Sequence, residues 1–267
     1  MKLPNLAQRV ACAAVGIPLV YLCLRQGGVV LLIAVDIILL FCLFEFTTLA
    51  RAKELRPNRL VSLLGGLAIS WDAYLYNGTH VIFLLFVALV CALMAGLVRD
   101  RRTFLHDASL TLFGLLLIGF GISSLLLIRR LPAGFEFAIL VFLLIWVCDT
   151  AAYFIGISLG RHPLWPQVSP KKTIEGALAG LLGAWAAVLA AKFTFIPEIS
   201  LLHGLALGTM AGLLGQAGDL VESAFKRFVE VKDSSRLLPG HGGFLDRFDS
   251  FFLTVPSVYY YIRFVLH

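Results

Sequence analysis

The chain has 267 residues, of which 60% are hydrophobic and 14% are charged, whereas a soluble domain carries about 25% charged residues. Such a chain cannot bury its apolar side chains in one aqueous core, so the composition excludes an ordinary soluble protein and predicts an integral membrane protein. The net charge of +6 does not indicate nucleic-acid binding, because basic residues in a membrane protein mark its cytoplasmic segments.

Nine runs of the sequence predict membrane-spanning helices, which need about 20 mostly apolar residues. Irregular backbone cannot face lipid, so each run is expected to be helical. In chain order the runs are Ala7–Leu24, Val29–Ala50, Leu60–Tyr76, Val81–Val98, Ala108–Ile128, Phe135–Leu159, Thr173–Phe193, Leu201–Ser223 and Phe244–Leu266. No small-residue cleavage site follows the first run, so we expect a retained span and not a signal peptide. The predicted fold class is an all-α integral membrane protein with about nine transmembrane helices.

The basic residues predict the orientation. With the N-terminus in the cytoplasm, 17 of the 22 Lys and Arg residues lie in inside segments and 5 lie outside. Cytoplasmic segments are enriched in these residues, and one missed helix would scramble the alternation. We therefore expect a multi-pass protein of the cell inner membrane with a cytoplasmic N-terminus.

The chain is expected to form one integral membrane unit with two parts. Residues 1–130 supply about five N-terminal helices, and residues 131–267 supply about four catalytic helices with a cytoplasmic loop. The longest polar stretch, Lys226–Arg247, lies on the inside and is the natural place for chemistry. The five cysteines lie singly in apolar runs, so neither a disulfide framework nor a zinc site is indicated.

Four carboxylates gather at two predicted helix ends, where charge is rare and usually functional. Asp219 and Glu222 close the eighth span together with Ser223, and Asp246 and Asp249 open the ninth. Spacings of three and four residues place side chains on one helix face. Between them lie basic residues and a glycine-rich run: Lys226, Arg227, Lys232, Arg236 and Pro239–Gly243. Carboxylates with substrate phosphates hold Mg²⁺, and basic side chains and glycine backbone bind anions. The pattern predicts a metal and polyphosphate site, and its alternative is a network of ion pairs.

Two further groups precede these helices. Ser169, Lys171 and Lys172 come before the seventh span, where the lysines are candidates for phosphate contact. Thr173 is expected to cap that helix or to bind phosphate at its N-terminus, and the alternative for the group is an ordinary helix boundary. Asp149–Tyr153 lies late in the sixth span, as part of the site or as interhelical hydrogen bonding.

The other intramembrane features are expected to be structural. Asp36, Glu45 and Asp72 lie in the second and third spans without a phosphate-binding pattern, so we expect them to pair within the helix bundle. The spacing of Gly208, Gly212 and Gly215 predicts close helix packing.

The run from Ser223 to Asp249 resembles the signature of the phosphatidate cytidylyltransferase family. The matching positions are Ser223, Phe225, Lys226, Arg227, Lys232, Asp233, Ser235, Leu238, Pro239, His241, Gly242, Gly243, Phe244, Asp246, Arg247, Phe248 and Asp249. The Ser169–Gly176 and Asp149–Tyr153 runs also resemble segments of the family, so the resemblance covers the C-terminal half. Ile157 departs from the pattern, since a basic residue is expected there.

The resemblance implies a multi-span homodimer that transfers the cytidylyl group of CTP to phosphatidic acid with Mg²⁺. It implies that Asp219 and Asp246 are metal ligands, with Asp249 a third candidate and K⁺ a candidate second cation. The expected catalytic residues are Asp219, Asp246, Asp249, Lys226, Arg227 and His241, the last as phosphate ligand or proton-transfer group. The expected substrate-binding residues are Asp149, Tyr153, Ser169, Lys171, Lys172, Thr173, Ser223, Lys232, Asp233, Gly242, Gly243 and Arg247.

Three other functions are weighed against this one. A CTP-dependent lipid alcohol kinase, of the dolichol or phytol type, would use the same nucleotide but would release CDP instead of pyrophosphate. An archaeal ether-lipid phosphate is a closer variant of the acceptor. A secondary transporter would place its acids near the bilayer midplane within repeats, whereas here the acids collect at one membrane face.

Overall fold

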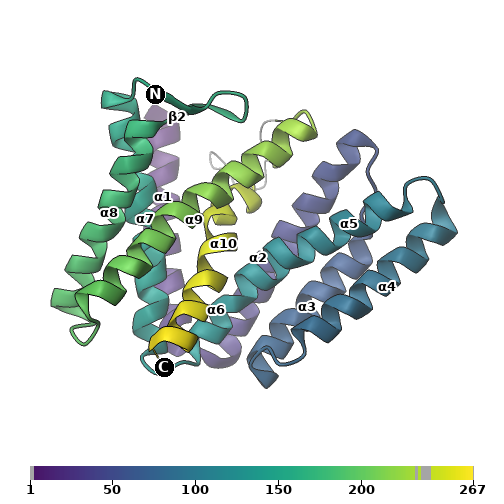
Figure 1. Cartoon of the computed structure of the whole chain (residues 1–267), viewed down its shortest axis with the longest axis horizontal. Helices are drawn as coiled ribbons and strands as arrows, with labels where there is room; N and C mark the ends of the chain where they lie inside the picture. Colours follow the sequence, from purple (N-terminus) through teal and green to yellow (C-terminus); the bar gives the residue numbers. More distant parts are fainter. Residues whose placement is uncertain (1–2, 232–233, 236–241, 267) are drawn as a thin grey trace. The chain divides into compact units, whose positions relative to one another are not determined.

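A computed structural model describes residues 3–231, 234–235 and 242–266, with side chains from residue 14 onward (Figure 1). The described chain is helical almost throughout, as predicted for an all-α membrane protein. Its one pair of strands, β1 (Pro163–Trp165) and β2 (Ser169–Thr173), is antiparallel and was not expected from the sequence. The chain divides into two compact units, Met1–Leu127 with Phe228–Phe248, and Ile128–Arg227 with Asp249–His267.

The first unit contains the N-terminal helices. Its elements are α1 (Leu3–Gln26), α2 (Gly28–Ala50), the 3₁₀ helix η1 (Arg51–Lys53), α3 (Arg59–Tyr76), α4 (Val81–Arg99), α5 (Phe104–Gly114), the π-helical η2 (Leu115–Phe120) and α6 (Gly121–Arg129). Helix α3 packs against α2, α4 and η2. A Cβ at Gly66 of α3 would lie 2.5 Å from Leu43 Cδ1 and 2.7 Å from Leu39 Cδ2. The missing side chain therefore lets α3 approach the fully buried leucines of α2.

The second unit is built around α7 (Gly134–Leu159) and α8 (Ile174–Thr194), which pack closely together. Its other elements are β1, β2, α9 (Leu201–Phe228), α10 (Leu245–Tyr261) from Asp249 onward and the π-helical η3 (Ile262–Leu266), whereas the first four residues of α10 belong to the first unit. Glycines of α8 face α7, and glycines of α9 face α8. A Cβ at Gly208 would lie 3.0 Å from Trp185 Cδ1, and one at Gly212 would lie 2.9 Å from Leu181 Cδ1. The predicted packing role of these two glycines is confirmed.

Five helical segments among the described residues are long and apolar enough to cross a membrane: Gly28–Lys53, Val81–Arg99, Phe104–Arg129, Gly134–Leu159 and Ile174–Thr194. The protein is therefore a multi-pass membrane protein. Each of the nine predicted runs is helical over most of its described residues. The exceptions lie at the ends: Thr173 belongs to β2, Phe244 precedes α10, and α9 continues to Phe228, beyond the predicted end at Ser223. That all nine cross the membrane stays a prediction.

Candidate active site

Three carboxylates of the second unit lie together where α9 meets α10. One oxygen from each of Asp219, Glu222 and Asp249 lies within 4.8 Å of the others. Glu222 is buried and the other two side chains are half-buried. Like charges held this close oppose one another, and hard oxygen donors are the ligands that Mg²⁺ prefers. The residues therefore fit a divalent cation.

A glycine brings the two helices together at this point. A Cβ at Gly218 would lie 2.4 Å from the carbonyl oxygen of Asp249, which is closer than any ordinary carbon–oxygen contact. One turn earlier on α9, a Cβ at Gly215 would meet α10 at 3.5 Å, at Thr254 Oγ1. The tight approach of α9 to α10 at Gly218 thus lies beside the carboxylate cluster.

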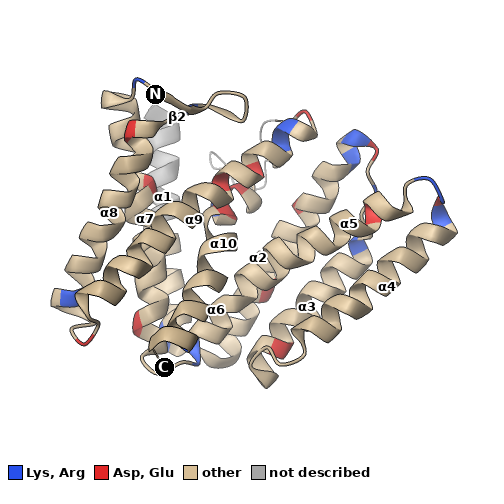
Figure 2. Ribbon diagram, viewed as in Figure 1, with Lys and Arg blue, Asp and Glu red and all other residues tan. Residues whose placement is uncertain are grey.

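Two lysines pair with two of the three carboxylates of the cluster. Lys172 Nζ lies 2.5 Å from Asp219 Oδ2, and Lys226 Nζ lies 2.6 Å from Glu222 Oε2, one turn along α9. The acidic and basic segments follow one another in the last turns of α9 (Figure 2). Ammonium groups that pair with carboxylates also pair with phosphate oxygens. One group of side chains thus combines carboxylates, which can bind a cation, with lysines, which can bind phosphate.

The β-hairpin presents Lys172 to α9. Side chains alternate along a strand, and β2 accordingly leaves Lys171 exposed while Lys172 is partly buried against Asp219. Arg227 Nε of α9 donates to the carbonyl oxygen of Val168, in the turn of the hairpin, at 3.3 Å. Two contacts therefore join the hairpin to the end of α9: Lys172 with Asp219, and Arg227 with Val168.

Thr173 caps α8, which confirms one of its two predicted roles. Its Oγ1 accepts a hydrogen bond from the backbone N–H of Gly176 at 3.1 Å. A Thr N-cap satisfies one of the free N–H groups of the first helical turn. The strand and the helix that follows it are therefore joined at a fixed angle directly after Lys172.

The second unit brings some of the other predicted residues to the cluster. Ser223 Oγ donates to Asp219 Oδ1 at 3.3 Å, and Asp149 of α7 interacts electrostatically with Asp249. Tyr153 is half exposed, with its ring edge-on to that of its neighbour Phe154 at 5.5 Å between centroids. Its contact with substrate stays a prediction.

In the first unit, a turn of two glycines surrounds the carboxylate of Asp246. Oδ2 of Asp246 accepts hydrogen bonds from Gly243 N at 3.0 Å, Ser234 N at 3.1 Å and Ser234 Oγ at 2.7 Å. Gly242 has φ 78°, and a Cβ there would lie 2.7 Å from the same oxygen. Arg247, the next residue, is exposed. The turn requires glycine both for its backbone angle and for space.

Some predicted site residues cannot be placed. Lys232, Asp233 and His241 lie outside the described residues, so their roles stay predictions. Asp246 belongs to the first unit and Asp219 to the second, so the cation they are predicted to share also stays a prediction. Glu222, in contrast, was recognised in the acidic group but was not chosen as a ligand. The sequence signal for Glu222 is its position three residues after Asp219, because this spacing places both carboxylates on one helix face.

The similarity to known proteins extends over almost the whole chain. Residues 7–265 match the model of the cytidylyltransferase family. The chain is 37% identical over 238 residues to the phosphatidate cytidylyltransferase of Staphylococcus aureus strain COL, a match that covers 87% of this chain and 90% of the relative. It is 35% identical over 240 residues to that of Staphylococcus saprophyticus, with the same two coverages. The likeness is therefore not confined to the signature.

Proposed function

The chain belongs to the cytidylyltransferase family, and from this premise we propose that it transfers the cytidylyl group of CTP to phosphatidic acid. A phosphate oxygen of phosphatidic acid bonds to the α-phosphorus of CTP. The bond from that phosphorus to the oxygen bridging the α- and β-phosphates breaks, and pyrophosphate leaves with the electron pair. The lipid product is CDP-diacylglycerol. The observation that carries the proposal is the cluster of Asp219, Glu222, Asp249 and Lys172 in a chain that matches this family over residues 7–265.

The main obstacle to the reaction is electrostatic, because two anions must meet. The nucleophile itself needs little activation, since phosphatidic acid is already negatively charged at neutral pH. Lys172 and Lys226 are held at the cluster by ion pairs, and they are proposed to exchange these carboxylates for phosphate oxygens when substrate binds. Positioned positive charge stabilises the charge that develops on a leaving phosphate. Arg227, beside Lys226, is a further proposed phosphate ligand.

Asp219, Glu222 and Asp249 are proposed to hold Mg²⁺, and Asp246 is proposed as a further ligand. Asp246 lies three residues before Asp249 on α10, and residues at this spacing share a helix face. When bound, the cation would neutralise phosphate charge and orient the reacting groups. K⁺ is proposed as a second cation by resemblance alone.

The proposed setting is the inner membrane, with nine crossings and the site facing the cytoplasm, where CTP is found. The distribution of basic residues supports this. In the first unit, the Lys and Arg segments at the end of α2, the start of α3 and the end of α4 lie toward the same side (Figure 2). Cytoplasmic segments gather these residues. A homodimer is proposed from the resemblance, and native mass spectrometry would test it.

The test is to identify the phosphate product. Purified protein receives CTP and Mg²⁺ with phosphatidic acid, with dolichol as an alcohol acceptor, or with no lipid. The proposal predicts pyrophosphate only with phosphatidic acid. Release of CDP with the alcohol would instead support the lipid alcohol kinase, one of the other functions weighed above.

A further inference from the structure

A buried carboxylate of α2 binds the signature segment, the run from Ser223 to Asp249. It accepts hydrogen bonds from residues 234–235 and from residues 244–245. Glu45 is only 2% exposed. Its Oε1 accepts hydrogen bonds from Ser235 Oγ at 2.6 Å and Phe244 N at 3.2 Å. Its Oε2 accepts from Leu245 N at 2.8 Å and Ser234 Oγ at 3.1 Å. A buried carboxylate is stable only when it is paired or well hydrogen-bonded, and here all four described donors come from the signature segment.

Two of these donors are backbone groups at the start of α10. The first N–H groups of a helix have no partner within the helix, and negative charge is favourable at this end. Glu45 accepts from Phe244 and Leu245, and so supplies the cap that α10 would otherwise need from its own neighbouring residues. The cap comes from a helix 200 residues earlier in the chain.

Two further contacts join α2 and η1 to the same part of the chain. Phe41, one turn before Glu45, stacks on the ring of Phe244 with centroids 4.7 Å apart and planes 11° apart. Lys53, two turns after Glu45, pairs with Glu230. That pair is largely exposed and contributes little stability, so Glu45 makes the principal contact.

Ser234 connects Glu45 to Asp246. Ser234 Oγ lies between the two carboxylates, 3.1 Å from Glu45 Oε2 and 2.7 Å from Asp246 Oδ2, which share its one hydroxyl proton. Gly243 donates its N–H to Asp246, and a Cβ at Gly243 would lie 2.4 Å from Glu45 Oε2. The turn around Asp246 is therefore built against Glu45.

We infer that Glu45 is a positioning residue that fixes the start of α10 and the carboxylate of Asp246 for the reaction. This inference rests on the proposed function for its catalytic consequence, but not for its structural one. Within the first unit, an N-terminal helix thus sets the position of Asp246 in addition to its own packing.

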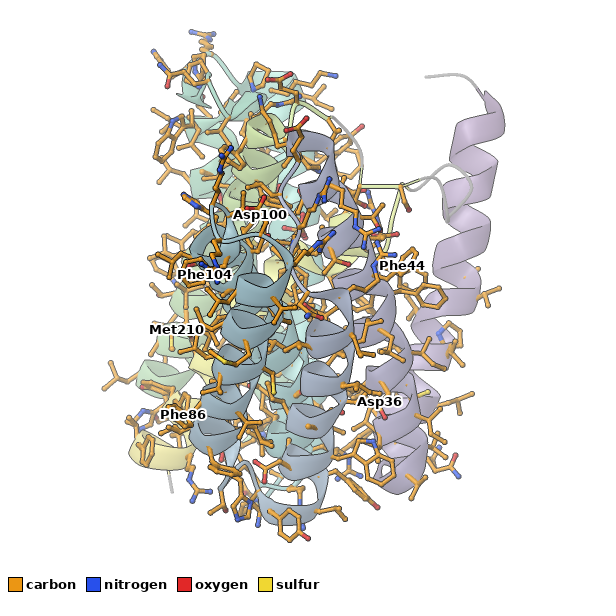
Figure 3. The ribbon with its side chains drawn as sticks, turned by 90° about the vertical axis from the view of Figure 1, so that its right-hand side faces the viewer. Asp36, Phe44, Phe86, Asp100, Phe104 and Met210 are labelled. Carbon is orange, nitrogen blue, oxygen red and sulfur yellow. The ribbon has the colours of Figure 1, made fainter. Side chains whose placement is uncertain are left out.

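The first test measures hydrogen exchange of the peptides that contain Ser234, Phe244 and Leu245, which needs no turnover. Glu45→Gln replaces one acceptor oxygen by an amide group that only donates, so exchange at Phe244 and Leu245 should accelerate by about tenfold or more. The matched control is Asp36→Asn on the same helix. Asp36 binds Ser70 and Trp71 and lies well along α2 from Phe44, the neighbour of Glu45 (Figure 3). Equal exchange in the two variants would overturn the inference.

The second test is kinetic. Glu45→Gln should lower kcat by about tenfold or more and raise the Mg²⁺ concentration for half-maximal rate, while the KM for CTP changes little. Ser235→Ala removes one of four donors without leaving a buried charge unpaired, and should give a smaller change in the same direction. It serves as the test if Glu45→Gln does not fold. Accelerated exchange with unchanged kcat and Mg²⁺ dependence would contradict a positioning role. Absence of CDP-diacylglycerol formation by the unmodified protein would refute the proposed function and leave the exchange result intact.

Discussion

Gly218 offers a sharp test of the site, because its lack of a side chain sets the distance between α9 and α10. In Gly218→Ala the added carbon would lie 2.4 Å from the carbonyl oxygen of Asp249. Carbon–oxygen contacts settle at about 3.3–3.6 Å, so α10 must retreat by about 1 Å. Overpacking of this kind costs about 1–3 kcal/mol, and a displacement of about 1 Å at a catalytic group lowers the rate by about 100-fold.

The assay compares CDP-diacylglycerol formation and thermal unfolding in detergent for two alanine variants. Gly215→Ala is the matched control, since its added carbon would meet α10 at an ordinary 3.5 Å and alanine favours the helix by up to about 1 kcal/mol. We expect Gly218→Ala to lose about two orders of magnitude in rate and to need more Mg²⁺, while Gly215→Ala keeps its activity. Equal activity of the two variants, with equal Mg²⁺ dependence, would refute the placement of the cation at this helix contact.

Three further variants test single side chains. Lys172→Met should lower kcat/KM by about 100-fold, and by clearly more than Lys171→Met, because β2 directs only Lys172 to Asp219; equal losses would argue against the hairpin geometry. Glu222→Gln should raise the Mg²⁺ requirement by about tenfold or more, and an unchanged Mg²⁺ titration would remove Glu222 from the ligand set. Asp246→Asn should abolish turnover while the protein still inserts and folds, whereas Asp100→Asn, in the loop after α4, should keep its activity. Near-normal activity of Asp246→Asn would contradict the assignment of Asp246 as a metal ligand.

The helices could be predicted because lipid allows few alternatives. Val81–Val98 was predicted and α4 spans Val81–Arg99, since a long apolar run in a membrane must satisfy its backbone within one segment. The N-cap at Thr173 and the packing of Gly208 and Gly212 were also predicted, because both depend on local spacing.

Features that depend on distant contacts could not be predicted. The hairpin around Ser169–Thr173 contains strands of three and five residues, too short for a clear alternating pattern, so the separation of Lys172 from Lys171 was not foreseen. Glu45 was expected to pair within the bundle. A lone acid in an apolar run does indicate a buried partner, but nothing in its neighbouring sequence identifies the start of α10 as that partner.

The most direct test of the central claim places a radioactive label at two different positions of CTP. Parallel reactions contain purified protein, Mg²⁺ and phosphatidic acid, with CTP labelled at the α-phosphate in one and at the γ-phosphate in the other. The account predicts that the α-label enters the lipid fraction and that the γ-label leaves in pyrophosphate. Transfer of the γ-label to lipid, with the α-label retained in CDP, would contradict it.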